Sequence, residues 1–269
     1  MTDIRPPVER SFVGIDHGRL HVAMCGTGFP VLLLHQTPRS WDEYRDVLPL
    51  IGETRRAVAM DTPGFGDSDA LPGTPTIEGW AAAALQLMES LAAERFAVVG
   101  HHTGAAIAAE IAAGAPGRVA ALVLSACPYV DAARRRHHAG QRVIDDVSER
   151  PDGSHLTELW NRRRPFYPEG DIDLLRRFMA DALRSGPMAV AGHRVVNRYH
   201  MEERIGLIRC PTLVLAPEND PNARSGGAVA AAIGGSVLRG IPGAQVPFPD
   251  QMPKLFAEQV AGFLNAHGC

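Results

Sequence analysis

The sequence lacks the features that mark several large classes of protein. Its only cysteines are Cys25, Cys127, Cys210 and Cys269, and their spacing matches neither a zinc-binding motif nor a disulfide framework. Its apolar runs, such as residues 31–34, are far too short to span a bilayer. The net charge of -3 gives no electrostatic footprint for nucleic acid or for an anionic membrane. These absences predict a protein that binds neither nucleic acid nor a membrane.

The first twelve residues also lack the apolar core of a secretory signal peptide, because they are polar and include Arg5, Glu9 and Arg10. Together with the scattered cysteines, this predicts a reduced, cytoplasmic protein. A length of 269 residues is enough to bury a sizeable core. The sequence leaves open whether two copies associate as a homodimer.

Strand-like and helix-like segments alternate along most of the chain. Residues 11–15 and 19–24 flank a turn and predict a hairpin. A continuous apolar run, typical of a strand covered on both faces, follows at residues 30–35. Further strands are predicted at residues 56–60, 96–99, 120–125, 211–215 and 236–241. Helical segments are predicted between or after them, at residues 41–51, 76–93, 105–109, 226–233 and 253–266. The alternation predicts an α/β fold, a mostly parallel sheet with helices on both faces.

Residues 127–209 have a different character. They are rich in arginine and contain no run typical of a buried strand. Apolar residues recur at helical spacing in residues 174–183. This segment therefore predicts a helical insert between two parts of the sheet domain.

The most informative segment is residues 100–104, with the sequence Gly-His-His-Thr-Gly. It follows the strand at residues 96–99 and opens the helix at residues 105–109. A tight turn of this kind holds its central residue in a strained conformation, and flanking glycines leave room for it. The pattern is that of the nucleophile elbow, Gly-x-Ser-x-Gly, with His102 in the place of the serine.

Two further motifs and the insert extend this likeness. Residues 35–38, His-Gln-Thr-Pro, resemble a His-Gly-x-Pro oxyanion turn, and residues 61–68 resemble an Asp-x-Pro-Gly-x-Gly-x-Ser loop. The chain thus resembles the α/β-hydrolase superfamily, in particular the capped branch of haloalkane dehalogenases, epoxide hydrolases and C–C hydrolases. The resemblance implies an α/β-hydrolase core at residues 1–126 and 210–269, and a helical cap at residues 127–209.

The resemblance also implies a catalytic triad, of which one member is kept. Asp220, in the stretch Pro-Glu-Asn-Asp-Pro at residues 217–221, matches the family's acid. Val246 stands where the family has its histidine, and the only histidine after Asp220 is His267, in the last turn of the chain. Ordinary serine acyl transfer is therefore not expected.

The imidazole of His102 is long enough to reach the space of the missing histidine and to hydrogen-bond Asp220. Such a pair is a general base oriented by a carboxylate. It would activate water for hydrolysis, or take a proton from the substrate in lyase-type chemistry. Covalent attack by His102 itself is a further alternative, as is a protein that has lost catalysis and only binds a small molecule.

Other candidate residues follow from the resemblance. The backbone N–H groups of Thr37 and Thr103 match the family's oxyanion donors. Gln36 replaces the usual glycine beside them and is a further candidate, because its side-chain amide would be able to face the pocket. Tyr199 resembles the cap tyrosine of epoxide hydrolases, a candidate proton donor, or else packs against the core. His101 either contacts the substrate or packs beside the pocket.

The histidines raise the question of a metal. His35, His101 and His102 are potential zinc ligands, but their spacing is not diagnostic, and we predict neither a metal nor a cofactor. The arginines at residues 134–136 and 162–164 either favour an anionic substrate or form solvated faces. The predicted partner is a small-molecule substrate between core and cap.

Overall fold

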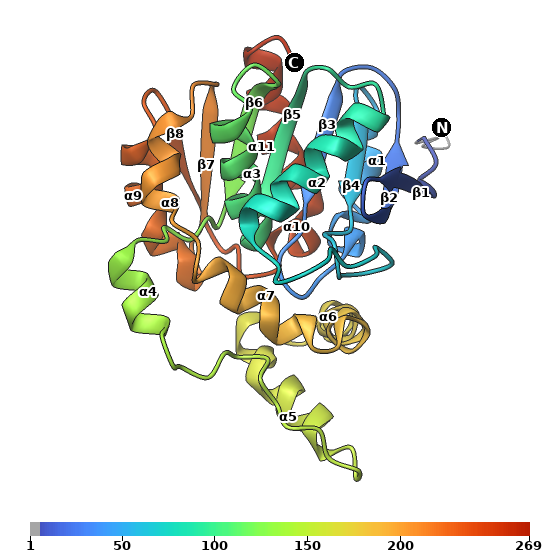
Figure 1. The fold of residues 1–269 in the computed structure, drawn as a ribbon, viewed down its shortest axis with the longest axis vertical. Helices are drawn as coiled ribbons and strands as arrows, with labels where there is room; N and C mark the ends of the chain where they lie inside the picture. Colours follow the sequence, from blue (N-terminus) through green and yellow to red (C-terminus); the bar gives the residue numbers. More distant parts are fainter. Residues whose placement is uncertain (1–5) are drawn as a thin grey trace.

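The computed structural model describes residues 6–269 and contains an eight-stranded sheet with helices on both faces (Figure 1). Its strands run in the spatial order β1-β2-β4-β3-β5-β6-β7-β8. Antiparallel pairing is confined to β1 with β2 and β2 with β4, and the other pairs are parallel. The strands are β1 (Glu9–Ile15), β2 (Gly18–Cys25), β3 (Pro30–Leu34), β4 (Arg56–Met60), β5 (Phe96–His101), β6 (Val119–Ser125), β7 (Thr212–Pro217) and β8 (Val237–Ile241). The predicted mostly parallel sheet is confirmed.

The continuous apolar runs arise because successive residues of a strand point to opposite faces, and both faces are covered. In β3, Leu32 and Leu34 pack on the face of α2 and α3, whereas Val31 and Leu33 pack on the face of α1 and α11. Figure 1 shows α2 and α3 in front of the strands and α11 behind them. These helices of the sheet domain are α1 (Leu48–Gly52), α2 (Ile77–Ser90), α3 (Thr103–Gly114), α9 (Gly226–Ala232), α10 (Phe248–Gln251) and α11 (Pro253–Ala266).

One predicted helix of the sheet domain is wrong in its extent. The segment expected to form one helix at residues 41–51 forms a 3-10 turn, η1 (Trp41–Tyr44), and then the separate short helix α1. Pro49 stands in the first turn of α1. Because proline lacks an N–H group and clashes with the preceding turn, it is tolerated where a helix begins and not in its interior.

The segment between β6 and β7 is helical, as predicted, and most of it lies beyond one end of the sheet (Figure 1). We call it the helical insert. No strand occurs in it among the described residues. Its helices are α4 (Ala132–His138), α5 (Ser154–Arg163), α6 (Ile172–Ser185), α7 (Met188–Val196) and α8 (Met201–Arg204), with the 3-10 turns η2 (Arg164–Phe166) and η3 (Ile205–Leu207).

A buried ionic cluster joins the helical insert to the sheet domain. The fully buried guanidinium of Arg39, in the loop after β3, donates to Asp181 of α6 at 2.8 Å and also pairs with Asp250 of α10. Arg177 of α6 donates to Asp42 at 2.7 Å. We call these five residues the Arg39 cluster. It fixes α6 over the loop that follows β3.

None of the helices in residues 6–269 is at once long enough and apolar enough to cross a membrane.

Candidate active site

The turn between β5 and α3 has the geometry of a nucleophile elbow. His102 stands between the strand and the helix with φ 49°, a left-handed conformation that few side chains adopt. A Cβ on Gly100 would lie 2.2 Å from the carbonyl oxygen of Gly104, and a Cβ on Gly104 would lie 1.9 Å from that of Leu34. Both glycines are therefore required by close backbone approach. They allow the turn to present His102 at the carboxyl end of the strand.

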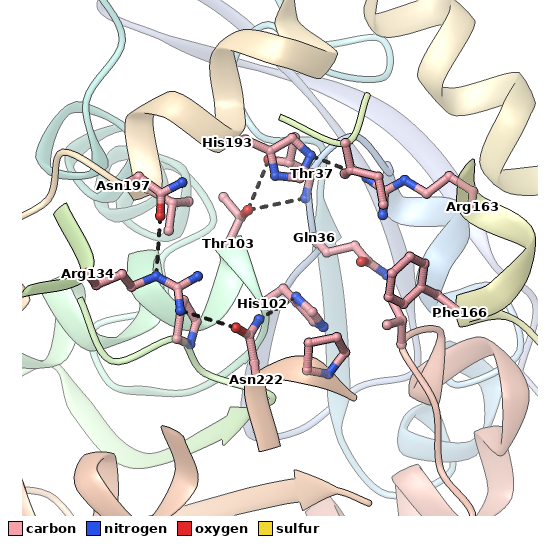
Figure 2. A pocket seen from close by; sticks show the side chains of 15 residues that line it. Gln36, Thr37, His102, Thr103, Arg134, Arg163, Phe166, His193, Asn197 and Asn222 are labelled. Carbon is pink, nitrogen blue, oxygen red and sulfur yellow. Dashed lines mark hydrogen bonds between the residues drawn. The ribbon is translucent and has the colours of Figure 1, made fainter. Parts of the chain in front are cut away.

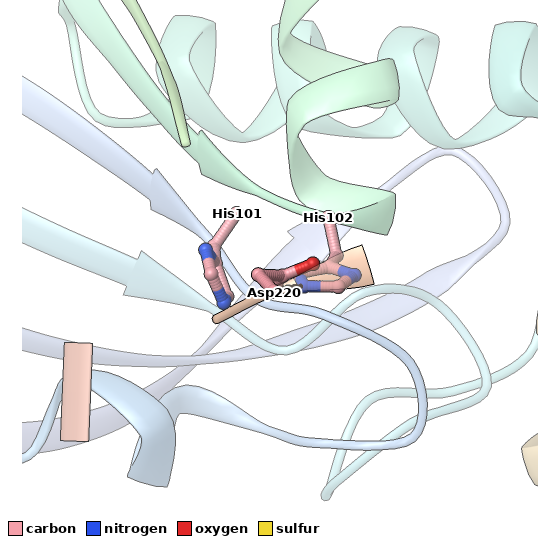
Figure 3. Close-up of side chains that lie close together, drawn as sticks. All are labelled: His101, His102 and Asp220. Carbon is pink, nitrogen blue, oxygen red and sulfur yellow. Dashed lines mark hydrogen bonds and ion pairs between the residues drawn. The ribbon is translucent and has the colours of Figure 1, made fainter. Parts of the chain in front are cut away.

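The ring of His102 contacts the carboxylate of Asp220 directly (Figure 3). The distance from Nε2 to Oδ2 is 2.6 Å, and the Asp220 side chain is fully buried. Burial raises the pKa of Asp220, but its interactions with His102 and the hydrogen bond from the backbone N–H of Asn222 outweigh burial, so this pKa lies below its ordinary value. Since an ionised carboxylate only accepts hydrogen bonds, Nε2 of His102 carries a proton.

The second nitrogen of His102 faces the amide of Asn222. The Asn222 Nδ2 group donates to Nδ1 of His102 at 2.9 Å, and its Oδ1 atom accepts from Nη1 of Arg134 at 3.5 Å. Because arginine has no acceptor, it fixes which end of the amide faces it. The arrangement therefore leaves Nδ1 unprotonated, as the basic nitrogen of the ring.

His102 and Asn222 line a pocket of about 190 Å³ between the sheet domain and the helical insert (Figure 2). The remaining lining residues are Gln36, Thr37, Thr103, Pro128, Arg134, Ile144, Arg163, Phe166, His193, Val196, Asn197, Pro221 and Val246. No serine, cysteine, aspartate or glutamate is among these described lining residues. The titratable lining groups are thus histidines and arginines.

The predicted oxyanion residues Thr37, Thr103 and Gln36 line this pocket, but the N–H of Thr37 and both donors of Gln36 already have partners. The N–H of Thr37 donates to Oγ1 of Thr103 at 3.3 Å, and the Thr103 hydroxyl donates to that of Thr37 at 3.0 Å. Both the backbone N–H and the side-chain amide nitrogen of Gln36 donate to the buried Glu43, at 2.8 and 2.5 Å. Burial raises the pKa of Glu43 to about 8. The turn is held rigidly, and an oxyanion would have to displace the Thr103 hydroxyl from Thr37.

The structure places His101 beside the pocket and not in its lining. Its Nε2 atom donates to the carbonyl oxygen of Val246 at 2.8 Å, so its Nδ1 atom, 2.9 Å from Oγ of Ser125, accepts from that hydroxyl. Burial lowers the pKa of His101 to about 3, which keeps the ring neutral. Both ring nitrogens already have partners, so this geometry favours a packing role.

Tyr199 and His35 also lie outside the pocket lining. The buried Tyr199 hydroxyl donates to Glu110 at 2.6 Å, on the side of α3 where Arg204 binds the same carboxylate. The Nε2 atom of His35 accepts from the N–H of Thr62 at 2.9 Å, and its Nδ1 atom donates to the carbonyl oxygen of Gln36 at 2.8 Å. The structure therefore does not bring Tyr199 to a substrate or His35 to His102.

Sequence reasoning did not find the second histidine of the pocket. His193, on α7, lies 2.8 Å through Nε2 from the buried carboxylate of Asp145, which also pairs with Arg163. These two partners overcome the effect of burial, and the pKa of Asp145 lies far below its ordinary value. Neither residue belongs to a motif. His193 and Asp145 come together only because the insert folds and packs.

Comparison with known proteins agrees with this fold. The model of a family described as alpha/beta hydrolase fold matches residues 30–221. Over 90 residues the chain is 33% identical to a soluble epoxide hydrolase of Corynebacterium sp. (strain C12), covering 34% of this chain and 32% of that protein. Over 131 residues it is 35% identical to a putative non-heme haloperoxidase of Mycobacterium phage D29, covering 48% of this chain and 45% of that protein. The matches thus span less than half the length of these curated relatives.

Solved structures show the same architecture over nearly the whole chain. An enol-lactonase from Burkholderia xenovorans LB400 superposes with a TM-score of 0.79 at 18% identity, covering 95% of this chain and 100% of that one. A hydrolase from Pseudomonas aeruginosa PA01 superposes with a TM-score of 0.79 at 22% identity, covering 95% of this chain and 98% of that one. At such identities the likeness concerns the fold alone. Because the family model matches most of the length of this chain, the chain belongs to the alpha/beta hydrolase fold family.

Proposed function

We propose that this protein is a hydrolase of a small organic molecule in which His102 acts as a general base and no serine attacks. The observation that carries the proposal is the 2.6 Å contact between Nε2 of His102 and the buried Asp220 at the elbow. Relatives named as epoxide hydrolases support a hydrolytic reaction over lyase-type proton transfer. The same base would serve either chemistry.

The geometry suggests how a proton would move. Asp220 keeps the His102 proton on Nε2, so Nδ1 is the nitrogen that accepts one. A water molecule that takes the place of the Asn222 amide at Nδ1 would lose its proton to the ring as it attacks the substrate. Asp220 would stabilise the imidazolium that forms, and Nδ1 would return the proton to the leaving group. The N–H groups of Thr37 and Thr103 are the proposed oxyanion donors.

We further propose that residues 127–209 act as a cap domain over the core formed by residues 1–126 and 210–269. The pocket supports this division, because residues of the insert, such as Arg134, Phe166 and His193, line it together with His102 of the core. Closing a site in this way excludes bulk water and strengthens electrostatic interactions inside it. Substrate choice would then depend on the insert.

One observation favours a second candidate function. Both nitrogens of His102 are hydrogen-bonded in the structure, Nε2 to Asp220 and Nδ1 to Asn222. A ring held on both sides fits a protein that binds a small molecule without converting it. In that case the Asn222 amide would stay on Nδ1 when a ligand binds.

The test compares the wild-type chain with His102→Gln and Asp220→Asn. Each variant is assayed on a panel of esters, lactones and epoxides. General-base catalysis predicts that both variants lose about 10²- to 10⁴-fold in kcat and keep the wild-type circular dichroism spectrum. A serine-directed fluorophosphonate is expected to leave the protein unlabelled.

Full turnover in His102→Gln, with the fold intact, would remove His102 from the mechanism. Stoichiometric fluorophosphonate labelling would show a serine nucleophile elsewhere. A wild-type protein that binds panel members and converts none of them would favour the binding protein.

A further inference from the structure

Arg134 is a cation of the pocket with weak partners. It lies half-buried on α4 and lines the pocket beside Asn197 and Asn222 (Figure 2). Its Nε atom donates to Oδ1 of Asn197 at 3.3 Å, and its Nη1 atom donates to Oδ1 of Asn222 at 3.5 Å. Hydrogen bonds between guanidinium and carboxylate groups are typically about 2.7–2.9 Å long. Two long contacts to neutral oxygens leave most of the five donors of Arg134 without a strong acceptor.

No carboxylate oxygen lies within 4.0 Å of the Arg134 guanidinium in the part of the chain that the structure describes. Two other arginines of the insert that lie near the pocket are paired, Arg135 with Glu202 and Arg163 with Asp145. Asp131 uses its Oδ1 atom to cap the helix, 2.7 Å from the backbone nitrogen of Arg134. Burial lowers the pKa of Arg134, as expected for a charge without a close counter-ion.

Of the two arginines that line the pocket, Arg134 is the one without a carboxylate partner. Arg163, the other lining arginine, is neutralised by Asp145 behind it. Asp220 is fully buried and covered by His102, so its carboxylate does not face the pocket space. Among the described lining residues, Arg134 is therefore the arginine that is free to pair with an anion in the pocket.

A basic groove adjoins the pocket. The two cavities share Asn197, and the lining of the groove also includes Arg194, Arg198 and His200. Arg194 and His200 pair with Asp146 and Glu203, whereas no carboxylate oxygen lies within 4.0 Å of the Arg198 guanidinium among residues 6–269. Clefts lined by one sign of charge raise the local concentration of the opposite ion. The groove thus offers an approach for an anionic ligand toward Arg134.

We propose that Arg134 and Asn197 bind a carboxylate of the substrate, so that the substrate is a small organic acid. This inference rests on the proposed function, because only an enzyme has a substrate, but the binding of a carboxylate does not itself require catalysis. The planar guanidinium matches a carboxylate with two parallel hydrogen bonds. A carboxylate on Nη1 would also replace the 3.5 Å contact to Asn222. Binding would therefore loosen the amide that covers Nδ1 of His102 and place the substrate next to that nitrogen.

The apolar lining residues define the rest of such a ligand. Ile144, Phe166 and Val196 face the same space as Arg134. A volume of about 190 Å³ is below the roughly 300–1,000 Å³ of pockets for drug-sized ligands. A short apolar body with one carboxylate fits these dimensions, and benzoate is a suitable probe.

The experiment measures benzoate and its neutral isostere benzamide by calorimetry and by thermal shift. It uses wild-type protein, Arg134→Gln, and Arg136→Gln as a matched control, because Arg136 is exposed on the same helix and does not line the pocket. Wild-type protein and Arg136→Gln are expected to prefer benzoate by at least about tenfold, the effect of a charge-assisted hydrogen bond. Arg134→Gln is expected to lose that preference.

His102→Gln separates this inference from the proposed function, because it is expected to lose turnover and keep the benzoate preference. Absence of a benzoate preference in the wild type, or its survival in Arg134→Gln with unchanged thermal stability, would overturn the carboxylate site. Tighter binding of inorganic phosphate than of benzoate would overturn the assignment to a carboxylic acid.

Discussion

Replacing Arg39 by methionine is expected to destabilise the protein strongly, because it removes the central cation of the Arg39 cluster. The Arg39 guanidinium is fully buried, donates to Asp181 at 2.8 Å and to Asp42 at 3.2 Å, and pairs with Asp250. Methionine fills much of the same space without the charge. Asp42 and Asp250 would keep Arg177 as a partner, whereas Asp181 would keep only the Ser40 hydroxyl, at 2.9 Å.

The size of the effect follows from the charges left behind. Removing one partner of a buried ion pair typically costs about 3–5 kcal/mol. Since Arg177 still compensates two of the three carboxylates, we expect a loss near the lower end, about 3 kcal/mol in the free energy of unfolding. For a chain of this size that corresponds to a fall in Tm of roughly 6–12 °C.

Urea unfolding followed by circular dichroism measures this loss, and Arg45→Met is the matched control. Arg45 pairs with the same Asp42, but its side chain is 52% exposed, so its loss is expected to cost at most about 1 kcal/mol. The double variant Arg39→Met with Asp181→Asn is expected to be more stable than the sum of the single changes, because it removes the orphaned charge. A loss below about 1 kcal/mol in Arg39→Met would refute the reasoning, because the cluster would then stabilise no more than a surface pair.

Two further predictions concern residues that the sequence placed near the site. The pKa of His101 is lowered from 6.5 to about 3, so the unfolded chain binds the proton more tightly. The stability that the neutral ring contributes is complete above about pH 6.5 and is lost as the pH falls toward 3, with a loss of about 2 kcal/mol between pH 7 and pH 5. Urea unfolding across this range should show a shallower slope for His101→Gln, and an unchanged slope would contradict the buried neutral ring. Tyr199→Phe is expected to lower stability by about 1–2 kcal/mol through its lost bond to Glu110 and to leave kcat unchanged, whereas a large fall in kcat would restore its role as proton donor.

The sheet was predictable because burial on both faces leaves a continuous apolar run at each central strand. The sequence of β5 and β6 carries this pattern, and every residue of both strands is buried. The split of the helix expected at residues 41–51 was less visible, because it depends on Pro49 and on Asp42 turning toward Arg39 and Arg177. The contact between Asp42 and Arg177 joins residues that are 135 positions apart in the sequence.

Half of the candidate site was also predictable from the sequence, because its residues lie in short motifs. His102, Thr37 and Asp220 lie in local motifs whose spacing fixes where each residue stands at the ends of β5, β3 and β7. Arg134 and His193 come from helices of the insert, and no local pattern says which face of those helices lines the pocket. That half of the site depends on packing between helices.

The histidine at the elbow and the valine at position 246 are explained together by the carboxylate of Asp220. Oδ2 of Asp220 is occupied by Nε2 of His102 at 2.6 Å, and Oδ1 accepts from the backbone nitrogen of Asn222 at 2.7 Å. A histidine at position 246 would have to compete for the same buried oxygens, while Val246 lines the pocket and its carbonyl accepts from His101. Under the proposed function, the two differences from the family pattern therefore form one change, in which the base stands at the elbow and water or the substrate takes the role of the nucleophile.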